Sequence, residues 1–444
     1  MSAIVRQTMS RNLAKNLLSE ILGSENQYFI GIGKSDVYNL EDTVVDPIDS
    51  PLEEKEFRNN LQSIKQIEGA TFVTKRYNWS SGTLYSAWSD SLSSDIDSQF
   101  YVLNDAKEVY ICLETGITQT GSINVSTIEP NYGALGVDYT QAFVTADGYK
   151  WKFLFSLTPE SIFQFLSSNY IPVHQPEDDL ATGDPIEDLQ FNVKQAAVGG
   201  QVIRCEIIEQ GSSFSSAPTV EIIGDGTGAT AVAYVSTQGH ITKIEMTDMG
   251  SGYTHASVSI QGDGVGAIAR TVVTDANGIG FDAINDLKTS SVMMNIKPDG
   301  EEDGTFIVEN EFRQIGVLKN PLTPAGSDFT DISAKVLPSV ELVDSSPFVV
   351  GKLVTGSQSG AVAYVNENVG NEVFFHQNES TGYGNFQVGE VLTQVGVVLT
   401  GTVASINEKN AIDRFTGDVL YIENRHRIRR DAEQQEDIKV VITV

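Results

Sequence analysis

The sequence predicts a mainly β protein, with a layered β-sandwich core, two inserted glycine-rich β-repeat modules and a short N-terminal helix. The composition is rich in glycine, 39 of 444 residues, and in Thr, Ser and Val, which is typical of strands and turns. Short alternating segments such as "ATFVTKRYNW" and "EVYICLE" are separated by polar turns. Two pairs of internal repeats show the same alternation with glycine punctuation.

One helix is expected near the start of the chain. Ser10 is positioned to cap it and Gly23 to end it. The apolar residues between them recur at helical spacing: Leu13, Leu17, Leu18, Ile21 and Leu22. A second helix is expected from Pro159 to Leu166, because proline suits the first turn of a helix. Almost all of the rest is expected to be β-structure.

The first repeat pair begins at Gly211 and Gly250. "GSSFSSAPTVEIIGDGTGATAVAYV" is echoed by "GSGYTHASVSIQGDGVGAIARTVV", and the aromatic residues Phe214 and Tyr253 occupy the same place in the two copies. The Gly-Asp-Gly-x-Gly turn leads into a strand, so its glycines are expected to take positive-φ positions. Such hairpin units must stack to bury their apolar faces.

The second repeat pair begins at Phe348 and Phe386, where "FVVGKLVTGSQSGAVAYV" resembles "FQVGEVLTQVGVVLTGTVASI". Both pairs read as insertions into a discontinuous core. The expected parts are 1–190 (core, N-terminal part), 191–290 (first β-repeat module), 291–344 (core, middle part), 345–405 (second β-repeat module) and 406–444 (core, C-terminal part). The acidic stretch from His174 to Gln190 is expected to be a solvated connection.

Charge and composition exclude several classes of partner. With 29 basic and 59 acidic residues, the net charge of −30 disfavours nucleic acid and anionic membrane surfaces. No apolar run approaches the roughly 20 residues of a spanning helix, and the opening lacks a signal-peptide pattern, so synthesis in the cytoplasm is expected. Cys112 and Cys205 are expected to be buried thiols, because they lack the spacing of a zinc site and are too few for a disulfide scaffold.

The stretch Gly31-Ile32-Gly33-Lys34-Ser35 looks like the end of a nucleotide-binding P-loop. That loop needs a glycine five residues before Gly33, where this chain has Tyr28. The following "DVYNLEDTVVDPIDSP" offers no helix N-terminus to stabilise a phosphate. We therefore expect a strand that runs into a turn, with Lys34 meeting a carboxylate or a turn carbonyl.

No catalytic, cofactor or metal site is predicted. "GSQSG" has Gln358 where a nucleophile elbow needs serine, and the turn at Gly224–Gly228 is not followed by a crossover helix. The acidic turns at 95–99 and 299–303 lack EF-hand spacing. The histidines occur singly and are expected on the surface or in turns: His174, His240, His255, His376 and His426.

Two features of the sequence allow more than one interpretation. Trp79 and Trp88 could line a sugar-binding groove or serve as core or interface anchors. The basic stretch "ENRHRIRR", Glu423 to Arg430, suits carboxylates of this fold or of a neighbouring subunit, and equally an exposed basic turn.

Five segments occur in an order that resembles the baseplate wedge proteins of T-even-type contractile-tailed bacteriophages, the family of the gene-eight product. They are "YFIGIGKSDVYN", "DGYKWKFLFSLTPE", "NYIPV", "EFRQIGVLKNPL" and "TGDVLYIENRHRIRRDAEQQEDIKVVITV", and they cover about half of the chain, outside both repeat pairs. In the last segment the family's spacing is kept by Tyr421, Glu423, Asn424, Arg425, Ile428, Gln434, Glu436 and Ile438. The family often has proline where this chain has His426, and arginine where it has Lys34.

The resemblance implies a non-enzymatic structural protein of the virion, made late in the host cytoplasm and located in the tail baseplate. It implies a homodimer in each baseplate wedge that contacts other wedge proteins and takes part in virus tail assembly and contraction. The motif or interface candidates are Lys34, Trp151, Phe312, Arg313, Asn320, Pro321, Tyr421, Glu423, Asn424, Arg425, Arg429, Gln434, Glu436 and Asp437. Alternatives are a receptor- or glycan-binding tail protein that uses the repeat modules, and an enzyme on surface polysaccharide, which would need paired carboxylates.

Overall fold

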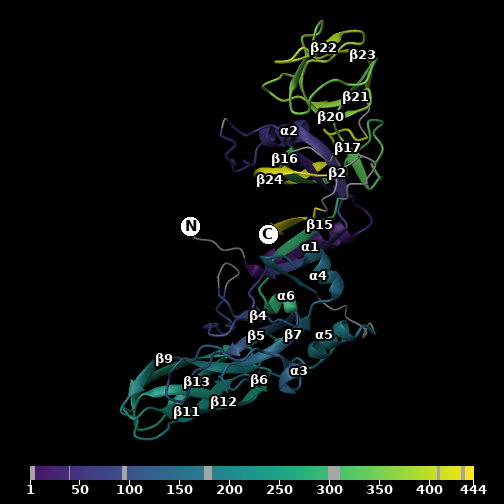
Figure 1. The fold of residues 1–444 in the computed structure, drawn as a ribbon. Coiled ribbons are helices and arrows are strands. Elements are labelled where there is room, and N and C mark those ends of the chain that lie inside the picture. Colours follow the sequence, from purple (N-terminus) through teal and green to yellow (C-terminus); the bar gives the residue numbers. More distant parts are fainter. Residues whose placement is uncertain are drawn as a thin grey trace. The chain divides into compact units, whose positions relative to one another are not determined.

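The computed structural model describes residues 6–39, 41–92, 98–174, 183–298, 311–407, 411–431 and 436–444. Strands make up 42% and helices 13%, which confirms the mainly β class. The strands form several antiparallel sheets and one closed barrel (Figure 1). Cys112 and Cys205 are buried free thiols, as expected.

The chain divides into two compact units. Unit 1 contains residues 1–15, 71–293 and 441–444, and unit 2 contains residues 16–70 and 294–440. Each unit holds one of the two repeat pairs. The boundaries fall inside α1 (Gln7–Leu22), β3 (Gly69–Lys75), β15 (Ser291–Ile296) and β25 (Ile438–Thr443), and the last three strands share a sheet with β8 (Tyr170–Val173) in the order β25-β15-β3-β8.

The helices agree only partly with the sequence prediction. Helix α1 ends before Gly23, but it begins at Gln7, so Ser10 lies inside the helix and does not cap it. The second expected helix is confirmed as α4 (Pro159–Phe165), where the Thr158 side chain accepts a hydrogen bond from the Ser161 amide. The short helices α3 (Tyr132–Leu135) and α6 (Ala283–Asp286) complete unit 1, together with α5 described next.

Two helices lie where the sequence was expected to form no helix. α2 (Pro51–Asn60) and α5 (Pro185–Gln195) both begin with proline, and the side chains of Ser50 and Asp184 cap them. Acidic residues in the first turn of each helix favour the positive end of its dipole. The prediction of a solvated connection is therefore wrong from Pro185 to Gln190, while residues 175–182 lie outside the described part of the chain.

An aromatic core fills the first part of unit 1. It lies on the sheet β4-β5-β7-β6, formed by β4 (Tyr101–Leu103), β5 (Glu108–Glu114), β7 (Lys150–Ser156) and β6 (Phe143–Val144). Trp151 is fully buried and stacks on Tyr149, with 5.7 Å between ring centroids. Trp88 is buried and Trp79 packs against the same cluster. Packing therefore accounts for both rings that could have lined a sugar groove.

The first repeat pair forms two sheets in unit 1, with orders β12-β11-β10-β13 and β14-β9. The strands are β9 (Val202–Ser212), β10 (Thr219–Gly224), β11 (Thr227–Val235), β12 (Ile241–Ser251), β13 (Ala256–Gln261) and β14 (Val265–Val273). β10 of the first copy pairs with β13 of the second, from Thr219 opposite Gln261 to Gly224 opposite Ala256. The two copies thus share a sheet.

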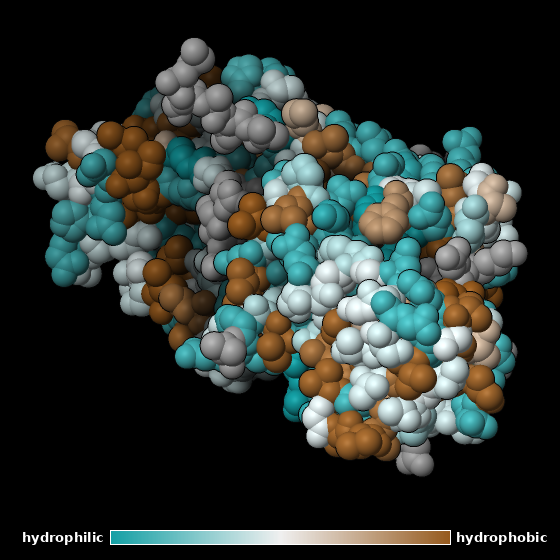
Figure 2. Space-filling model, turned by 90° about the horizontal axis from the view of Figure 1, so that it is seen from above, coloured by the Kyte–Doolittle hydropathy of each residue, from teal (hydrophilic) through white to brown (hydrophobic). Residues whose placement is uncertain are grey.

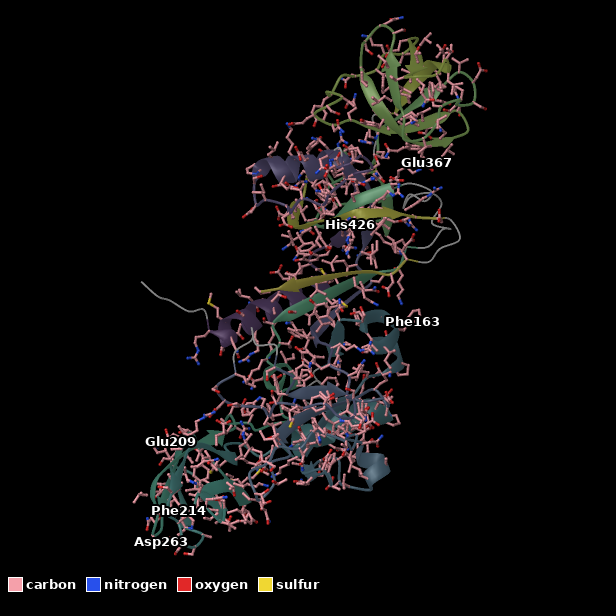
Figure 3. The ribbon with its side chains drawn as sticks, turned by 60° about the vertical axis from the view of Figure 1, so that its left-hand side comes forward. Phe163, Glu209, Phe214, Asp263, Glu367 and His426 are labelled. Atoms are coloured by element: carbon pink, nitrogen blue, oxygen red, sulfur yellow. The ribbon has the colours of Figure 1, made fainter. Side chains whose placement is uncertain are left out.

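Each copy also packs its aromatic residue on the glycine turn of the other copy. A Cβ at Gly264 would lie 2.4 Å from Phe214, and a Cβ at Gly226 would lie 2.4 Å from Tyr253. Asp263 accepts from the Ser215 amide, close to Phe214 at the same end of this module (Figure 3). The expectation that all these turn glycines have positive φ is wrong, because only Gly228 and Gly266 do. Gly226 and Gly264 instead make room for a ring.

Unit 2 is built on a five-stranded sheet with the order β17-β2-β1-β16-β24. Its strands are β17 (Ser333–Lys335), β2 (Leu61–Gln66), β1 (Tyr28–Gly33), β16 (Glu311–Lys319) and β24 (Asp418–Arg429). Helix α2 packs on one face through Phe57, which is fully buried. Its ring sits over Gly31 and Gly316, which are opposite each other in the β1–β16 ladder.

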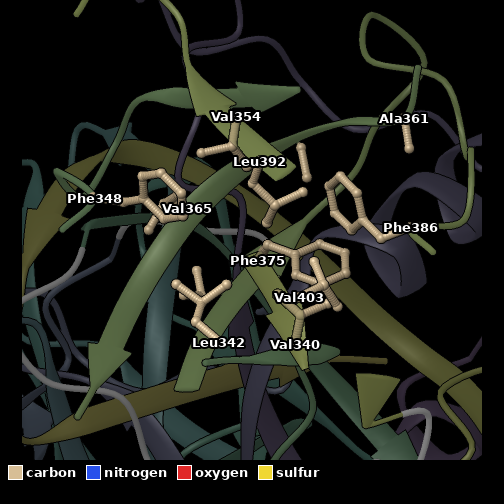
Figure 4. Close-up of a cluster of buried hydrophobic side chains, with 12 residues drawn as sticks. Val340, Leu342, Phe348, Val354, Ala361, Val365, Phe375, Phe386, Leu392 and Val403 are labelled. Carbon is tan, nitrogen blue, oxygen red and sulfur yellow. The ribbon is translucent and has the colours of Figure 1, made fainter. Parts of the chain in front are cut away.

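The second repeat pair lies in a closed barrel with the order β18-β21-β20-β19-β22-β23. Its strands are β18 (Ser339–Leu342), β19 (Leu353–Gly356), β20 (Val362–Val369), β21 (Glu372–His376), β22 (Val391–Gln394) and β23 (Thr400–Asn407), so the barrel begins before residue 345. The repeat aromatics Phe348 and Phe386 both enter its core (Figure 4).

Candidate interaction surface

The turn after β1 holds Lys34 and has no phosphate cradle. Lys34 has φ 61°, and its amide donates to the Asn60 carbonyl at 3.1 Å. Its Nζ lies 3.8 Å from Asp36 Oδ2 and 5.3 Å from the centroid of the Tyr38 ring. The expected carboxylate partner is confirmed. A Cβ at Gly33 would lie 2.4 Å from the Asn60 oxygen, so this glycine permits a close approach of two backbones.

The same turn joins the sheet to the barrel of unit 2. Ser35 Oγ lies 3.2 Å from His376 Nδ1, and Asn378 Nδ2 donates to Asp36 Oδ2 at 3.0 Å. His376 stacks on Tyr364, and burial lowers the pKa of His376 to about 4, which the nearby Asp36 carboxylate only partly offsets. The prediction of a surface or turn position is wrong for His376, which is a neutral core residue at the end of β21.

Replacing Lys34 by alanine is expected to destabilise unit 2 by about 1 kcal/mol, because it removes a partly buried ion pair and a cation–π contact. Urea unfolding followed by far-UV circular dichroism measures the loss. Lys34→Arg should stay near the native value, since it keeps the charge beside Asp36. The exposed Lys352→Ala is the matched control. Equal stability of Lys34→Ala and Lys352→Ala would contradict a structural role for this cation.

Arg313 on β16 is held from several sides. Its guanidinium donates to both carboxylate oxygens of Asp42, with Nε 2.8 Å from Oδ1, and to the Ser35 carbonyl at 2.6 Å. The Arg313 guanidinium in turn holds the pKa of the Asp42 carboxyl below its ordinary value. The Arg313 side chain is 3% exposed. Arg313 therefore anchors the segment from Ser35 to Asp42 and is not itself a contact surface.

Tyr38 fills a bulge between β16 and β24. Its hydroxyl donates to the Arg313 carbonyl and accepts from the Arg425 amide at 3.0 Å. The bulge arises because three residues of β24, 425–427, lie opposite one residue of β16. Burial raises the pKa of Tyr38 to about 12. Sequence reasoning missed both Tyr38 and Asp42, because their partners lie hundreds of positions away and neither belongs to a periodic pattern.

The structure brings most candidate residues onto three neighbouring strands, β1, β16 and β24. In the β16–β24 ladder, Glu311 is opposite Arg429, Gln314 is opposite Asn424 and Val317 is opposite Tyr421. The candidates on or beside these strands are Lys34, Phe312, Arg313, Tyr421, Glu423, Asn424, Arg425 and Arg429. Phe312 is buried in the core, whereas the Arg429 side chain is 61% exposed.

Asn320 and Pro321 come directly after the C-terminal end of β16. Asn320 has φ 50°, and its side chain accepts from the Gln27 amide at 2.7 Å and donates to Asn26 at 2.8 Å. Pro321 is buried beside Gly417, the residue before β24. These residues close the end of the sheet.

The remaining candidates lie elsewhere. Trp151 belongs to the core of unit 1, and Gln434 lies outside the described residues. Glu436 accepts from the buried Arg430 at 2.8 Å, and Asp437 pairs with Lys439 at 2.6 Å. Both acids are therefore used within unit 2.

A groove runs beside the first half of β24. It has a volume of about 430 Å³ and is lined by residues 419–422 on one side and by residues 47–51, 53 and 54 on the other. Ile48 and Leu420 are among its lining residues, with 69% and 45% of their surface exposed. Asp49, Glu53 and Glu54 make its second wall acidic. On the visible face in Figure 2, hydrophobic side chains lie in separate groups among hydrophilic ones.

The described residues contain no group of three or more His, Cys, Asp or Glu side chains that could hold a metal ion. No helix in the same part of the chain is long and apolar enough to span a membrane. The candidate residues gather most densely on β16 and β24, where charged side chains lie beside the groove along β24. In the comparisons with known proteins, no protein-family model and no curated protein matched the chain.

Proposed function

We propose that this protein is a structural subunit of the baseplate wedge of a contractile phage tail. It acts through protein–protein interfaces in baseplate assembly and in the rearrangement on contraction, as a homodimer that binds other wedge proteins of the same phage. It carries out no catalysis and uses no cofactor.

The proposal rests on the ordered series of segments that resemble the wedge family. Three of these segments, which begin at Tyr28, Glu311 and Thr416, supply β1, β16 and β24, three adjacent strands of one sheet. The segments from Asp147 and Asn169 supply β7, α4 and β8. The matched residues thus fall in the regular framework of both units, as expected if the resemblance reflects a shared fold rather than scattered coincidence.

The test is coexpression of the full chain with the other wedge proteins of the same phage, followed by affinity purification. We expect a stable complex of defined stoichiometry. The variant Glu209→Gln changes an exposed residue of the first repeat module and serves as a control for the yield of the complex in the purification. If no complex forms while the purified chain binds host glycans, the wedge proposal fails and the receptor-binding alternative takes its place.

A further inference from the structure

A pocket of about 530 Å³ lies in unit 1, at one end of the sheet β25-β15-β3-β8. Its lining includes Lys75 at the end of β3, Tyr170 at the start of β8 and Ser291 at the start of β15. Ser10 of α1 and residues 287–290, which follow α6, also line it. Every lining residue belongs to unit 1. The volume lies within the usual range of about 300–1,000 Å³ for small-molecule sites.

The lining of this pocket is unusual for so acidic a chain. Ten of its sixteen described residues are Ser, Thr or Tyr, and none of the sixteen is Asp or Glu. The charged side chains among them are those of Lys75 and Lys288. In the whole chain, 59 of 444 residues are acidic. The pocket is therefore a region of hydroxyl groups in a protein that is otherwise rich in carboxylates.

Four of the hydroxyl groups in the lining have no hydrogen-bond partner among the described residues. They belong to Ser10, Ser98, Tyr170 and Ser290. Each of the four oxygens is open to solvent, because none is among the buried unpartnered side-chain atoms of the described chain. A hydroxyl group supplies one donor and two acceptor positions and rotates to suit its partner. These four groups, from four separate segments, are therefore available to a ligand in the pocket.

Two threonines of the lining keep only acceptor capacity. The Tyr101 hydroxyl donates to the Lys75 carbonyl at 2.8 Å, so Thr74 Oγ1, which lies 2.8 Å from that hydroxyl, is the donor to it. Thr289 Oγ1 donates to the Val73 carbonyl. Because the single proton of each threonine hydroxyl is used, the two oxygens retain only lone pairs. The pocket thus combines fixed acceptors with hydroxyl groups that can turn.

Tyr77 and Tyr170 bring aromatic surface to the same pocket, and both side chains are partly buried. The Tyr77 ring lies against Tyr101, with 5.3 Å between centroids, and Tyr170 packs against a buried cluster that contains Val73 and Phe165. Both rings are thus held in place by the core of unit 1. A tyrosine ring combines an apolar face with a polar edge. A sugar ring is divided in the same way, with C–H groups on its faces and hydroxyl groups around its edge.

We propose that this pocket binds a saccharide of one or two sugar units. The available hydroxyl groups and fixed acceptors match the donors and acceptors of sugar hydroxyls, and the tyrosine rings match the C–H faces. The site binds without hydrolysis, because cleavage of a glycosidic bond needs a pair of carboxylic acids and none of the described lining residues is Asp or Glu. The site lies outside both repeat pairs and requires neither the homodimer nor the wedge partners of the proposed function.

Saturation-transfer difference NMR on the full chain tests the site. The sugars offered, at millimolar concentration, are glucose, galactose, N-acetylglucosamine, glucuronic acid, maltose and lactose, and free tryptophan is the apolar probe. We expect at least one sugar to bind with a Kd of about 1 mM or tighter. Transfer should be strongest at the C–H protons of its ring, and tryptophan should not displace it. Absence of transfer to every sugar, or displacement by tryptophan, overturns the proposal.

Two conservative variants locate the bound sugar. Tyr170→Phe and Ser290→Ala each remove one available hydroxyl group and leave the rest of the pocket in place. Each should weaken binding by about 3- to 10-fold, the usual effect of one lost hydrogen bond between neutral groups. Ser216→Ala removes an exposed hydroxyl in the first repeat module and should bind like the native chain. Equal affinity of the three variants would show that the sugar binds elsewhere.

A blocking variant completes the test. Ser10→Trp adds a large ring to the lining and should abolish binding, whereas Met9→Trp, at the neighbouring side chain that is 57% exposed, should preserve it. Thermal melts followed by circular dichroism verify that the variants are folded. If Ser10→Trp does not fold, hydrogen exchange of the native chain decides: the sugar should slow exchange in residues 73–77 and 287–291, and protection confined to other segments overturns the proposal. Recovery with wedge proteins tests the proposed function separately, because it does not depend on the sugar.

Discussion

Replacing Gly316 by alanine should destabilise unit 2 by about 3 kcal/mol, the upper end of the usual range for overpacking. A Cβ at this position would lie 2.4 Å from Phe57 Cζ and 2.9 Å from the Tyr421 carbonyl oxygen. The side chain of Phe57, on α2, is fully buried and cannot move away without disturbing the core. Phe57→Ala alone should cost about 3–5 kcal/mol, because it leaves a cavity.

The double variant tests whether the ring is the cause. In the Phe57→Ala background, Gly316→Ala should cost at least about 1 kcal/mol less than in the native chain, since the ring that it meets has gone. The stability of unit 2 is measured by hydrogen exchange of peptides from β1 and β16 and by far-UV circular dichroism in urea. Tryptophan fluorescence gives an internal reference, because Trp79, Trp88 and Trp151 all belong to unit 1. Gly133→Ala is the control, since its nearest atom lies 3.5 Å away. Equal costs of Gly316→Ala in both backgrounds would show that the ring is not responsible.

This glycine illustrates what the sequence could predict and what it could not. Alternation and glycine punctuation correctly predicted the mainly β class, and the lone cysteines were correctly assigned as buried thiols. The reason for Gly316 lies in Phe57, which belongs to a helix more than two hundred positions earlier in the sequence. Contacts between distant segments leave no local pattern, so the function of such a glycine cannot be derived from spacing alone.

The helices show a second limit of structure prediction from the sequence. Ser50-Pro51 and Asp184-Pro185 are start signals in which a capping residue precedes a proline at the first helical position. The sequence analysis nevertheless predicts a solvated connection from His174 to Gln190 and no helix N-terminus in the stretch that ends at Ser50-Pro51, because both stretches are acidic and contain prolines. Both segments form helices although their helical periodicity is weak, because side chains cap their N-termini and their buried residues pack against the rest of the fold. At Ser10 the opposite error occurred, because a plausible cap lies one turn inside α1.

The candidate surface was predictable in part. Lys34 meets Asp36 as expected, and the basic stretch at Glu423–Arg430 does contact carboxylates of its own fold, through Glu423, Glu311 and Asp431. The sequence alone did not predict the adjacency of β1, β16 and β24, because it depends on long-range pairs such as Tyr28 opposite Lys319 and Glu311 opposite Arg429. It therefore could not separate the inward Arg313 from the outward Arg427 and Arg429.

Replacing Trp151 by alanine is expected to destabilise unit 1 by about 3–5 kcal/mol. The side chain is fully buried, stacks on Tyr149 and meets Tyr85 edge-on with 5.6 Å between centroids. The wedge resemblance puts Trp151 among the motif candidates, but burial means that it can act only through folding. Its indole Nε1 finds no hydrogen-bond acceptor among the described residues, so Trp151→Phe removes no hydrogen bond and should cost less than half as much as Trp151→Ala.

Two measurements separate a folding role from a binding role for Trp151. Urea unfolding followed by the fluorescence of Trp79 and Trp88 should show the loss of stability for Trp151→Ala and a much smaller one for Trp151→Phe. Phe163→Ala, at a side chain that is 72% exposed, should change stability by no more than about 0.5 kcal/mol. Below its unfolding transition, Trp151→Ala should bind the proposed wedge partners on coexpression as the native chain does, because none of its ring is available to a partner. A variant of native stability that fails to assemble would instead place this ring at an interface and contradict its assignment to the core.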